Sequence, residues 1–328
     1  MSKLASRWYG EPGWLKAALP AEWLFKTVAG YRREYLTRHA WKPSVPVIVV
    51  GNISVGGTGK TPVIAALVHW AKMKGFLPGI VSRGYGGKSP HYPRLVTASD
   101  DPAECGDEPV LLASQCQCPV AIDPDRASAV RLLLRDHAVN LILCDDGLQH
   151  YSLGRDIEIA VIDGARGFGN GHCLPVGPLR EPVSRLAKVD FCLQNGPSHE
   201  HLLNREPWPM EIVAKSLTRL SDAQEYSLDT LKGQPLEAIA GIGNPQRFWN
   251  TLNECGFEIA VARTFEDHHA FVQADLERKT PYPLIMTAKD AIKCSQWADE
   301  NTWQLNIEAQ LPDAFFEALA SKLCERKT

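Results

Sequence analysis

A glycine-rich stretch that ends in lysine and threonine is the part of this sequence best suited to chemistry. It reads Gly51-Asn-Ile-Ser-Val-Gly-Gly-Thr-Gly-Lys60-Thr61 and follows a short apolar run at residues 47–50. The apolar run is typical of a buried parallel strand, and a run compatible with a helix begins at Pro62. A loop between strand and helix binds phosphates through its backbone N–H groups. We therefore expect Lys60 to contact the β and γ oxygens of a nucleotide, and the Thr61 hydroxyl to bind Mg²⁺.

One residue of this loop departs from the strict phosphate-loop pattern. The pattern has glycine where this chain has Ser54, but the three glycines that follow still allow the backbone to approach phosphate closely. The alternative is a glycine-rich turn between strand and helix that binds nothing. The Gly-Lys-Thr ending behind a buried strand favours phosphate binding. The predicted nucleotide-binding residues are Ser54, Gly56, Gly57, Thr58, Gly59, Lys60 and Thr61.

Two adjacent acids follow another apolar run. Residues 140–144 predict a strand, and Asp145 and Asp146 come directly after it. In a phosphate-loop fold, an Asp at the end of a neighbouring strand completes the Mg²⁺ site beside the loop threonine. Carboxylates also cap ordinary loops, and the run at residues 157–162 ends in Asp163 as well. Position alone therefore leaves the metal-binding acid open.

Transfer of a phosphoryl group needs a carboxylate or histidine near the attacking hydroxyl and cations for the developing charge. The candidate acids and bases are Asp107, His150 and the adjacent His268 and His269. The candidate phosphate-binding cations are Arg83, Arg126 and Arg180. Each of these, taken singly, is more commonly structural. Adjacent side chains on a strand point to opposite faces, which disfavours a metal site at the histidine pair.

The bulk properties indicate an ordinary two-domain protein. A chain of 328 residues exceeds what one hydrophobic core usually covers. Its net charge of −3 argues against a nucleic-acid partner bound through a general positive field. The nine cysteines are scattered without a Cys-x-x-Cys pair, which favours a reducing cytosol over a disulfide framework or a zinc site. No apolar run is long enough to span a bilayer.

The charge of the chain is uneven. Residues 1–42 carry eight Lys or Arg and three Glu, a net charge of +5 that leaves −8 for the rest, together with four of the nine tryptophans. Residues 20–38 predict a helix with basic residues flanking an apolar row made of Leu24, Val28, Tyr31 and Tyr35. Such a helix suits an anionic membrane surface. The alternative is a helix packed on its own domain with solvated basic residues. The clustered tryptophans and the charge favour the membrane.

Apolar strands alternate with helical patterns through the rest of the chain. Six strand candidates lie between residues 45 and 193, with helical patterns between them. This rhythm predicts βαβ units around a mostly parallel sheet. A polar, proline-containing stretch at residues 196–209 predicts a linker, and a second alternating unit follows it. The expected fold is α/β, with a P-loop-type, mostly parallel sheet domain and a second, smaller α/β domain.

Eight short blocks follow one another between residues 45 and 290. They are Gly51-Asn-Ile-Ser-Val-Gly-Gly-Thr-Gly-Lys-Thr-Pro62, Ser82-Arg-Gly-Tyr-Gly86, Gly106-Asp-Glu-Pro109, Asp145-Asp-Gly-Leu-Gln-His150, Leu179-Arg-Glu-Pro182, Gly241-Ile-Gly-Asn-Pro245, Phe265-Glu-Asp-His268 and Met286-Thr-Ala-Lys-Asp290. Together they resemble the tetraacyldisaccharide 4′-kinase family, the lipid A 4′-kinases. The family's loop also has serine at the position of Ser54, whereas Leu148 and Ala288 stand where the family often has Phe and Glu.

The resemblance implies an ATP-dependent kinase of lipid A biosynthesis. Such an enzyme transfers the γ-phosphate to the 4′-hydroxyl of a tetraacylated glucosamine disaccharide 1-phosphate, with ATP and Mg²⁺ bound in a cleft between two hinged α/β domains. Asp107 would orient or deprotonate the 4′-hydroxyl, paired with His268 from the second domain. The metal ligands would be Thr61, Asp145 and Asp146. The substrate or cleft residues would be Arg83, Arg126, Gln149, His150, Arg180 and Glu181.

The expected organisation follows from the same resemblance and from the composition. Residues 1–42 are a basic amphipathic membrane-associating segment, residues 43–208 a P-loop kinase domain, and residues 209–328 a hinge with a smaller C-terminal α/β domain. The expected partners are the acylated disaccharide 1-phosphate lipid and an anionic membrane surface, with no nucleic acid and no obligate protein partner. The expected location is peripheral, at the cytoplasmic face of the inner membrane. Domain closure would assemble the catalytic pair and exclude water.

A partitioning-type ATPase switch at a membrane surface is the alternative interpretation. Those proteins share the Gly-Gly-x-Gly-Lys-Thr loop, but they carry Lys directly before the two glycines, where this chain has Val55. A third interpretation, a membrane module with a vestigial loop, leaves the polar blocks unexplained. The sequence leaves open whether Asp145 or Asp146 binds the metal. It also leaves open whether Asp107 takes the proton or only orients the hydroxyl.

Overall fold

The structure of the protein is a computed structural model that describes residues 7–197 and 206–325. The strands are β1 (Val47–Gly51), β2 (Pro78–Ser82), β3 (Arg94–Val96), β4 (Val120–Ile122), β5 (Leu141–Asp145), β6 (Ile157–Asp163), β7 (Phe191–Asn195), β8 (Trp208–Arg219), β9 (Gln224–Tyr226), β10 (Pro235–Ala240), β11 (Glu258–Thr264), β12 (Leu284–Thr287) and β13 (Thr302–Gln310). The α-helices are α2 (Leu19–Arg38), α3 (Lys60–Met73), α4 (Pro102–Cys105), α5 (Asp107–Cys116), α6 (Arg126–Asp136), α7 (Pro245–Glu254), α8 (Ala288–Cys294) and α9 (Asp313–Glu325). Short 3₁₀ helices are η1 (Gly13–Ala18), η2 (Val183–Lys188), η3 (Leu228–Leu231), η4 (Gln273–Leu276) and η5 (Ser295–Trp297).

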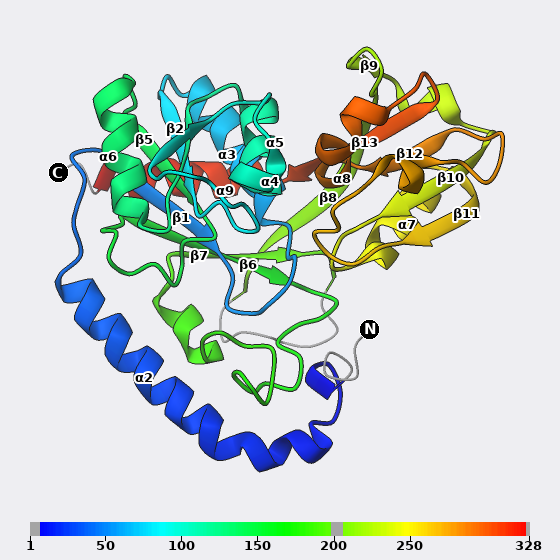
Figure 1. Cartoon of the computed structure of the whole chain (residues 1–328). Helices are drawn as coiled ribbons and strands as arrows, with labels where there is room; N and C mark the ends of the chain where they lie inside the picture. Colours follow the sequence, from blue (N-terminus) through cyan, green and yellow to red (C-terminus); the bar gives the residue numbers. More distant parts are fainter. Residues whose placement is uncertain (1–6, 198–205, 326–328) are drawn as a thin grey trace.

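Within the described ranges, all strands belong to one sheet that runs through both halves of the molecule (Figure 1). The strand order is β11-β10-β12-β13-β8-β7-β6-β1-β5-β2-β4-β3, with β9 paired to β8. Most neighbouring strands are parallel, and β3–β4, β8–β9 and β8–β13 are antiparallel. The expected α/β fold with a mostly parallel sheet is confirmed.

Buried strands form the centre of the first half. Every residue of β1, β2 and β5 is buried, because helices cover both faces of the sheet. On one face, residues of α3, α5 and α9 pack together around Ile64 and Leu112. On the other face, α6 contributes Val130 and Leu133 to a second core. The central strands thus hold rigidly the loops that leave their carboxyl ends.

Strand β8 joins the two halves of the sheet and was not predicted. Its first residues, Trp208 to Met210, pair in parallel with β7, and residues 211–219 pair with β13 in antiparallel register. The sequence predicted a linker at residues 196–209, of which residues 198–205 lie outside the described ranges. The strand was missed because its polar and apolar residues do not alternate regularly and Pro209 lies near its start.

The last helix returns to the first half of the molecule. Phe315, Leu319 and Leu323 of α9 are buried in the same core as residues of α3 and α5. The helix was expected, but as part of the domain at residues 209–328. The division of the chain into domains at residue 208 stays a prediction, and the packing of α9 shows that the chain crosses between the halves a second time.

Helix α2 lies along the outside of the molecule, below the sheet in the view of Figure 1. Its predicted apolar row of Leu24, Val28, Tyr31 and Tyr35 is between 53% and 73% exposed. The alternative of a helix packed on its own domain predicts burial of this row, so the exposure argues against that alternative. None of the helices in the described ranges is long and apolar enough to cross a membrane.

Candidate active site

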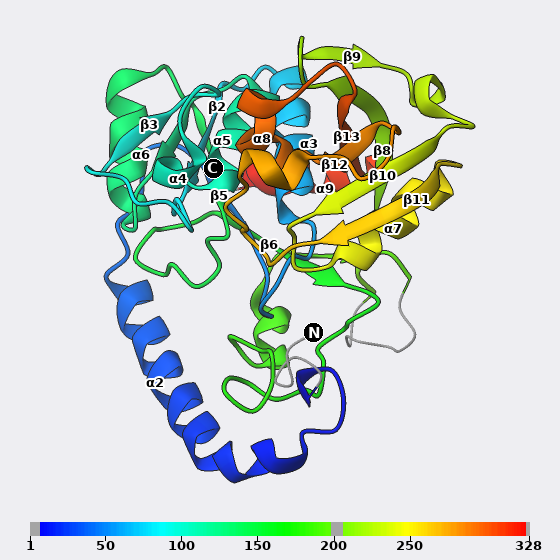
Figure 2. The same ribbon diagram turned by 45° about the vertical axis from the view of Figure 1, so that its right-hand side comes forward.

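A cleft of about 810 Å³ lies between the two halves of the molecule. One wall is the glycine-rich loop from Val55 to Thr61, at the carboxyl end of β1, and the opposite wall comes from the second half. Figure 2 shows α8, which belongs to the second half, beside α5 of the first half. The predicted residues that line the cleft are Gly56, Gly57, Thr58, Gly59, Lys60, Thr61, Arg83, Arg126, Asp146, Gln149, His150, Arg180 and His268. A larger hollow, of about 1600 Å³, is lined by residues of α3, α9 and β13 and by none of the predicted site residues.

The glycine-rich loop has the conformation that its sequence requires. Gly59 immediately precedes α3 and has a φ of 98°, in the region that favours glycine. A Cβ there would lie 2.7 Å from Cδ1 of Ile212, so a side chain would also collide with β8. Because Lys60 and Thr61 begin α3, their N–H groups lie at a helix N-terminus, where an anion is stabilised.

Side-chain amides hold the loop from both sides. Asn52 Nδ2 donates to the Gly56 carbonyl at 3.2 Å, and Asn195 Nδ2 donates to the Thr58 carbonyl at 3.0 Å. Ser54 pairs with Leu179 in an isolated bridge and is not part of the cleft lining. The structure therefore places Ser54 among the residues that shape the loop.

Lys60 and two neighbouring charges form an ion-pair cluster at the cleft. Lys60 Nζ lies 3.4 Å from Asp146 Oδ1, and Arg180 Nη1 donates to Asp146 Oδ2 at 3.0 Å. Burial raises the pKa of the Asp146 carboxyl, but the two cations outweigh burial and hold this pKa below its usual value. Asp146 is therefore an ionised carboxylate at neutral pH. Its backbone lies in the left-handed region, with a φ of 46°.

Asp145 lies behind this cluster at the end of β5. It is fully buried, and Ser82 Oγ donates to its Oδ2 at 3.3 Å. Its Oδ1 is also buried and has no hydrogen-bond partner. Burial, with the negative charges of Glu108 and Asp146, raises the pKa of Asp145 to about 7. A buried carboxyl with an unpartnered oxygen is suited to a cation as its missing partner.

The oxygen atoms at this end of the cleft fit Mg²⁺. Thr61 supplies a hydroxyl, and Asp145 and Asp146 supply carboxylates. Mg²⁺ prefers such oxygen ligands and usually binds through one or two carboxylates, substrate phosphate and water. Among the residues described here, no three His, Cys, Asp or Glu side chains are arranged to hold a metal by themselves. A bound phosphate would therefore have to complete the site.

Asp107 and His268 meet at the border of the cleft, which His268 lines and Asp107 does not. Asp107 is the first residue of α5, and His268 lies in the loop after β11, yet Asp107 Oδ2 and His268 Nδ1 are 3.1 Å apart. The backbone of His268 has a φ of 61°, a strained value for this residue that is typical of functional sites. The Tyr85 ring packs edge-on against the imidazole, with ring centroids 5.3 Å apart. The expected pairing of the two side chains is present in the structure.

The pKa of Asp107 is set by opposing effects. Burial raises it, whereas the hydrogen bond to His268 and the charges of Lys293 and Lys289 lower it. The balance holds the Asp107 pKa below the value of an ordinary aspartate. Asp107 is therefore ionised at neutral pH, as an acceptor of a hydrogen bond or a proton must be.

The remaining predicted residues form the third side of the cleft. The backbone N–H of Arg126 donates to His150 Nε2 at 3.2 Å, and burial, followed by the charge of Arg126, lowers the pKa of His150 to about 4. His150 is thus neutral at physiological pH. Gln149 Nε2 donates to Glu181 Oε2 at 2.9 Å, and Tyr151 also donates to Glu181. Glu181 is buried behind Gln149, outside the lining of the cleft.

Comparisons with known proteins agree with this geometry. The family described as tetraacyldisaccharide-1-P 4′-kinase matches residues 14–324. The tetraacyldisaccharide 4′-kinase of Aeromonas hydrophila is 48% identical over 321 residues, which cover 96% of this chain and 94% of that protein. The chain belongs to the tetraacyldisaccharide 4′-kinase family. Membership confirms the resemblance seen in the eight blocks, and it makes the chain a kinase.

Other relatives of this kinase lead to the same family. The tetraacyldisaccharide 4′-kinase of Aeromonas salmonicida is 46% identical over 98% of the chain and 96% of that protein. A crystal structure of an LpxK from Aquifex aeolicus, described as an "apo" form in complex with ATP, superposes with a TM-score of 0.79. It is 26% identical and covers 94% of this chain and 99% of the other. The alternative of a partitioning-type ATPase is not favoured.

The sequence did not identify several residues of the kinase cleft. Arg247 of α7 lines the cleft and donates to the buried Asp163 at 2.8 Å, which ties the second half to the end of β6. Lys289 and Lys293 of α8 lie beside His268 and Asp107, with Lys289 Nζ 3.3 Å from His268 Nε2 and Lys293 Nζ 3.5 Å from Asp107 Oδ2. A signal was present for Lys289, which lies in the block at residues 286–290 that had no assigned role, whereas Arg247 and Lys293 lie outside the eight blocks. Thr287 and Asp290 also form hydrogen bonds with each other that start α8, a capping pattern readable from the sequence.

Proposed function

We propose that this kinase transfers the γ-phosphate of ATP to the 4′-hydroxyl of a tetraacylated glucosamine disaccharide 1-phosphate, in lipid A biosynthesis. The observation that carries the proposal is the Asp107–His268 contact of 3.1 Å, made between two halves of the molecule beside a phosphate-binding loop. A loop alone suits any nucleotide hydrolase. A paired carboxylate across the cleft suits an enzyme that must position an acceptor hydroxyl.

The nucleotide-binding part of the proposal rests on the loop and its cations. Backbone N–H groups at the start of α3 and the ammonium of Lys60 bind the phosphates, and Arg180 adds a second cation beside Asp146. Thr61 with Asp145 or Asp146 would hold Mg²⁺, which would supply positive charge beside the phosphate oxygens. The relative from Aquifex aeolicus was crystallised with ATP, which supports the choice of nucleotide.

The transfer itself needs little more than positioning. The oxygen of the 4′-hydroxyl attacks the γ-phosphorus, the bond from phosphorus to the β–γ bridging oxygen breaks, and ADP leaves with that oxygen. Asp107 accepts the hydroxyl proton or a hydrogen bond from it, since its carboxylate is ionised. His268 holds the carboxylate in place from the second half. Because the pair spans both halves, closure of the cleft would assemble the pair and exclude water from it.

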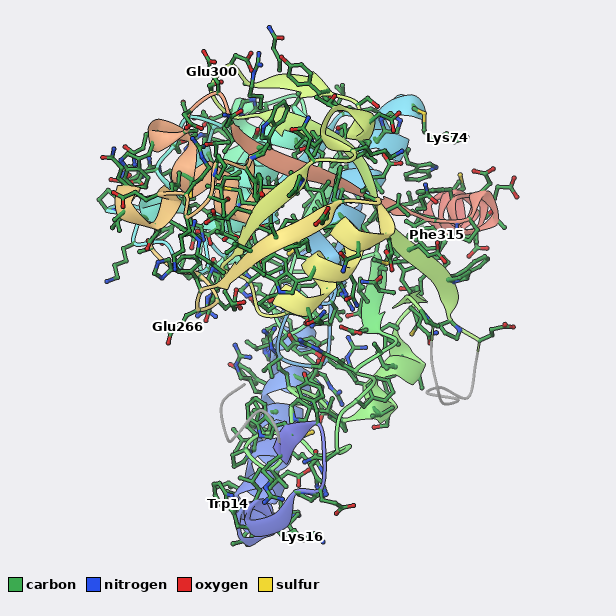
Figure 3. The ribbon with its side chains drawn as sticks, turned by 90° about the vertical axis from the view of Figure 1, so that its right-hand side faces the viewer. Trp14, Lys16, Lys74, Glu266, Glu300 and Phe315 are labelled. Atoms are coloured by element: carbon green, nitrogen blue, oxygen red, sulfur yellow. The ribbon has the colours of Figure 1, made fainter. Side chains whose placement is uncertain are left out.

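The acceptor carries acyl chains, and α2 offers a surface for the membrane that holds them. Its exposed apolar row is flanked by Lys26, Arg32 and Arg38, so one side suits acyl chains and the other suits anionic headgroups. In Figure 3 this segment projects from the body, with Trp14 and Lys16 at its far end. We place the protein peripherally at the cytoplasmic face of the inner membrane.

The reaction is tested with γ-labelled ATP, Mg²⁺ and the tetraacylated disaccharide 1-phosphate in detergent. We expect the label to appear in a bisphosphorylated lipid. The labelled lipid should be lost with Lys60→Ala and kept with Lys74→Ala, at the other end of α3. Lys74 is a suitable control because its side chain is exposed. Label found only as free phosphate, at a rate that the lipid does not change, would refute the acceptor.

Membrane binding is tested by flotation with anionic vesicles. Tyr31→Glu puts a carboxylate into the exposed row of α2, whereas Met73→Glu makes a matched change at another exposed apolar side chain, on α3. We expect Tyr31→Glu to reduce the bound fraction and Met73→Glu to leave it unchanged. Equal binding of both variants would mean that α2 does not contact the bilayer.

A further inference from the structure

Helix α8 presents two lysines to the Asp107–His268 pair. Lys289 and Lys293 are four residues apart, so they lie on the same face of the helix, and α8 packs against α5, which begins with Asp107. Figures 1 and 2 both show α8 next to α5. The mechanism given above uses neither lysine.

Lys289 contacts the far side of the His268 ring. Its Nζ lies 3.3 Å from Nε2, while Nδ1 of the same ring faces Asp107. An ammonium group donates hydrogen bonds and accepts none, so Nε2 must accept and the ring proton must be on Nδ1. The carboxylate of Asp267 is 4.0 Å from Nε2, beyond hydrogen-bond distance.

Lys289 is charged in this environment. Burial lowers its pKa, but the carboxylates of Glu108 at 3.5 Å and Asp267 at 3.8 Å outweigh burial and raise the pKa above its usual value. The lysine therefore remains an ammonium group at neutral pH. Because the Nε2 lone pair accepts from Lys289, this nitrogen has no site for a second proton.

Lys293 contacts the carboxylate of the pair. Its Nζ lies 3.5 Å from Asp107 Oδ2 and 3.2 Å from Asp290 Oδ1, and it donates to the His269 carbonyl at 3.1 Å. The aliphatic stem is enclosed as well, and only 10% of the side chain is exposed. Solvent therefore screens the attraction between the Lys293 ammonium and Asp107 weakly.

The charged groups that face Asp107 come from two elements of the second half. His268 approaches from the loop after β11, and Lys293 and Lys289 approach from α8. All three favour the ionised carboxylate. Asp290 also faces Lys293, but it is bound to the Gly241 N–H and the Thr287 hydroxyl, which keep it in place independently of the lysine.

We propose that Lys289 and Lys293 are positioning residues that fix the protonation pattern of the catalytic pair. Lys289 holds His268 in the neutral tautomer with its proton on Nδ1, and Lys293 keeps Asp107 ionised. The inference rests on the proposed function, because it concerns the pair assigned to the acceptor hydroxyl. Only with this pattern does His268 donate to Asp107 while the carboxylate remains free to receive the acceptor's proton or hydrogen bond.

The role of Lys293 is tested through the pH dependence of kcat for phosphate transfer to the lipid. Lys293→Gln removes the charge but keeps a donor for the His269 carbonyl, so the pKa of Asp107 should rise. We expect the acidic limb of the profile to move to higher pH by about one unit. Lys293→Arg should restore the limb, and Lys232→Met, at an exposed lysine of the same half, should leave it in place. If Lys293→Gln lowered kcat equally at every pH and left the acidic limb in place, the proposed role of Lys293 would be wrong.

The role of Lys289 is tested without turnover by nitrogen NMR of the histidine-labelled protein. The signals of His268 are assigned by their loss in His268→Gln. We expect a proton on Nδ1 and a bare Nε2 in the wild type. In Lys289→Met, Asp107 still fixes the Nδ1 proton, and we expect part of the molecules to carry a proton on Nε2 as well. The same single tautomer in both proteins, or a proton on Nε2 in the wild type, would overturn the role. If the wild type transfers no phosphate to the lipid, the proposed function is wrong. The NMR result does not depend on transfer, so it tests the role of Lys289 separately.

Discussion

A buried carboxylate attaches α2 to the body of the protein, and its removal should loosen that helix. Glu22 is 2% exposed, although it lies in the first turn of a helix whose outer face is in solvent. It accepts hydrogen bonds from the Cys173 N–H at 2.9 Å and from His172 Nδ1 at 2.8 Å, and Lys26 pairs with it at 2.6 Å. We predict that Glu22→Gln detaches α2 from the loop that carries these partners.

The expected size of the effect follows from the contacts. A hydrogen bond to a charged group contributes about 1.5–3 kcal/mol, and the amide of Gln retains one acceptor oxygen and loses the charge. The free energy that holds α2 in place should therefore fall by about 2 kcal/mol. Glu34 is a matched control on the same helix, because it forms a similar i,i+4 pair with Arg38 but is 63% exposed. Glu34→Gln should cost about 0.5 kcal/mol or less.

Hydrogen exchange of the Cys173 amide measures this attachment directly. A loss of about 2 kcal/mol corresponds to roughly 30-fold faster exchange in Glu22→Gln, with almost no change in Glu34→Gln. Burial raises the pKa of Glu22, but its hydrogen bonds to Lys26, Cys173 and His172 outweigh burial and lower it overall. The protection should therefore be complete above the pKa of an unfolded Glu, about 4.3, and should decline as pH falls through the lower native value. Equal exchange rates in the two variants would refute the argument.

Three further predictions concern the cleft. If Asp107 and His268 act as a unit, the double variant Asp107→Asn/His268→Gln should transfer phosphate almost as fast as the slower single variant, and multiplying losses in kcat would mean separate roles. Arg247→Met should lower the free energy of unfolding by about 2 kcal/mol, because it leaves Oδ2 of the buried Asp163 without a partner. Denaturant titration checks this, and adding Asp163→Asn should recover part of the loss. The pKa of His150 is about 4 in the folded protein, so between pH 4 and about 6.5 the folded state binds fewer protons at this residue than the unfolded state. The free energy of unfolding should therefore rise with pH across this range. The rise should be shallower in His150→Gln, and an unchanged slope would contradict the neutral imidazole.

Local sequence signals predicted the first half of the fold and its phosphate-binding loop. The strands β1 and β5 are short and apolar, and β1 is also rich in β-branched residues. A loop that needs glycine is recognisable from its composition, and Gly59 has the positive φ that requires this residue. Both features are decided by residues that are neighbours in the chain. Lys60, Thr61 and Asp146 therefore appear in the cleft where the sequence analysis expected them.

Contacts between distant segments were not predictable in the same way. Strand β8 is a strand because β7 and β13 pair with it at different ends, and its own irregular order of polar and apolar residues does not reveal either partner. Lys293 is ordinary in sequence, and only the packing of α8 on α5 brings its ammonium to Asp107. The resemblance to a family supplied the Asp107–His268 pairing, which spacing alone leaves open.

If the protein binds the membrane as proposed, the position of α2 connects that attachment to catalysis. The helix exposes Tyr31 on its outer side, whereas the neighbouring Arg32 lines the cleft and Arg33 lies 3.9 Å from the buried Glu181. One helix thus contributes to an apolar surface and to the polar wall of the site. A lipid acceptor could therefore keep its acyl chains in the bilayer while its sugar reaches Asp107, provided that α2 stays attached through Glu22. Because attachment depends on a few buried polar contacts, loosening α2 should impair use of the lipid while leaving nucleotide binding at the loop before α3 intact.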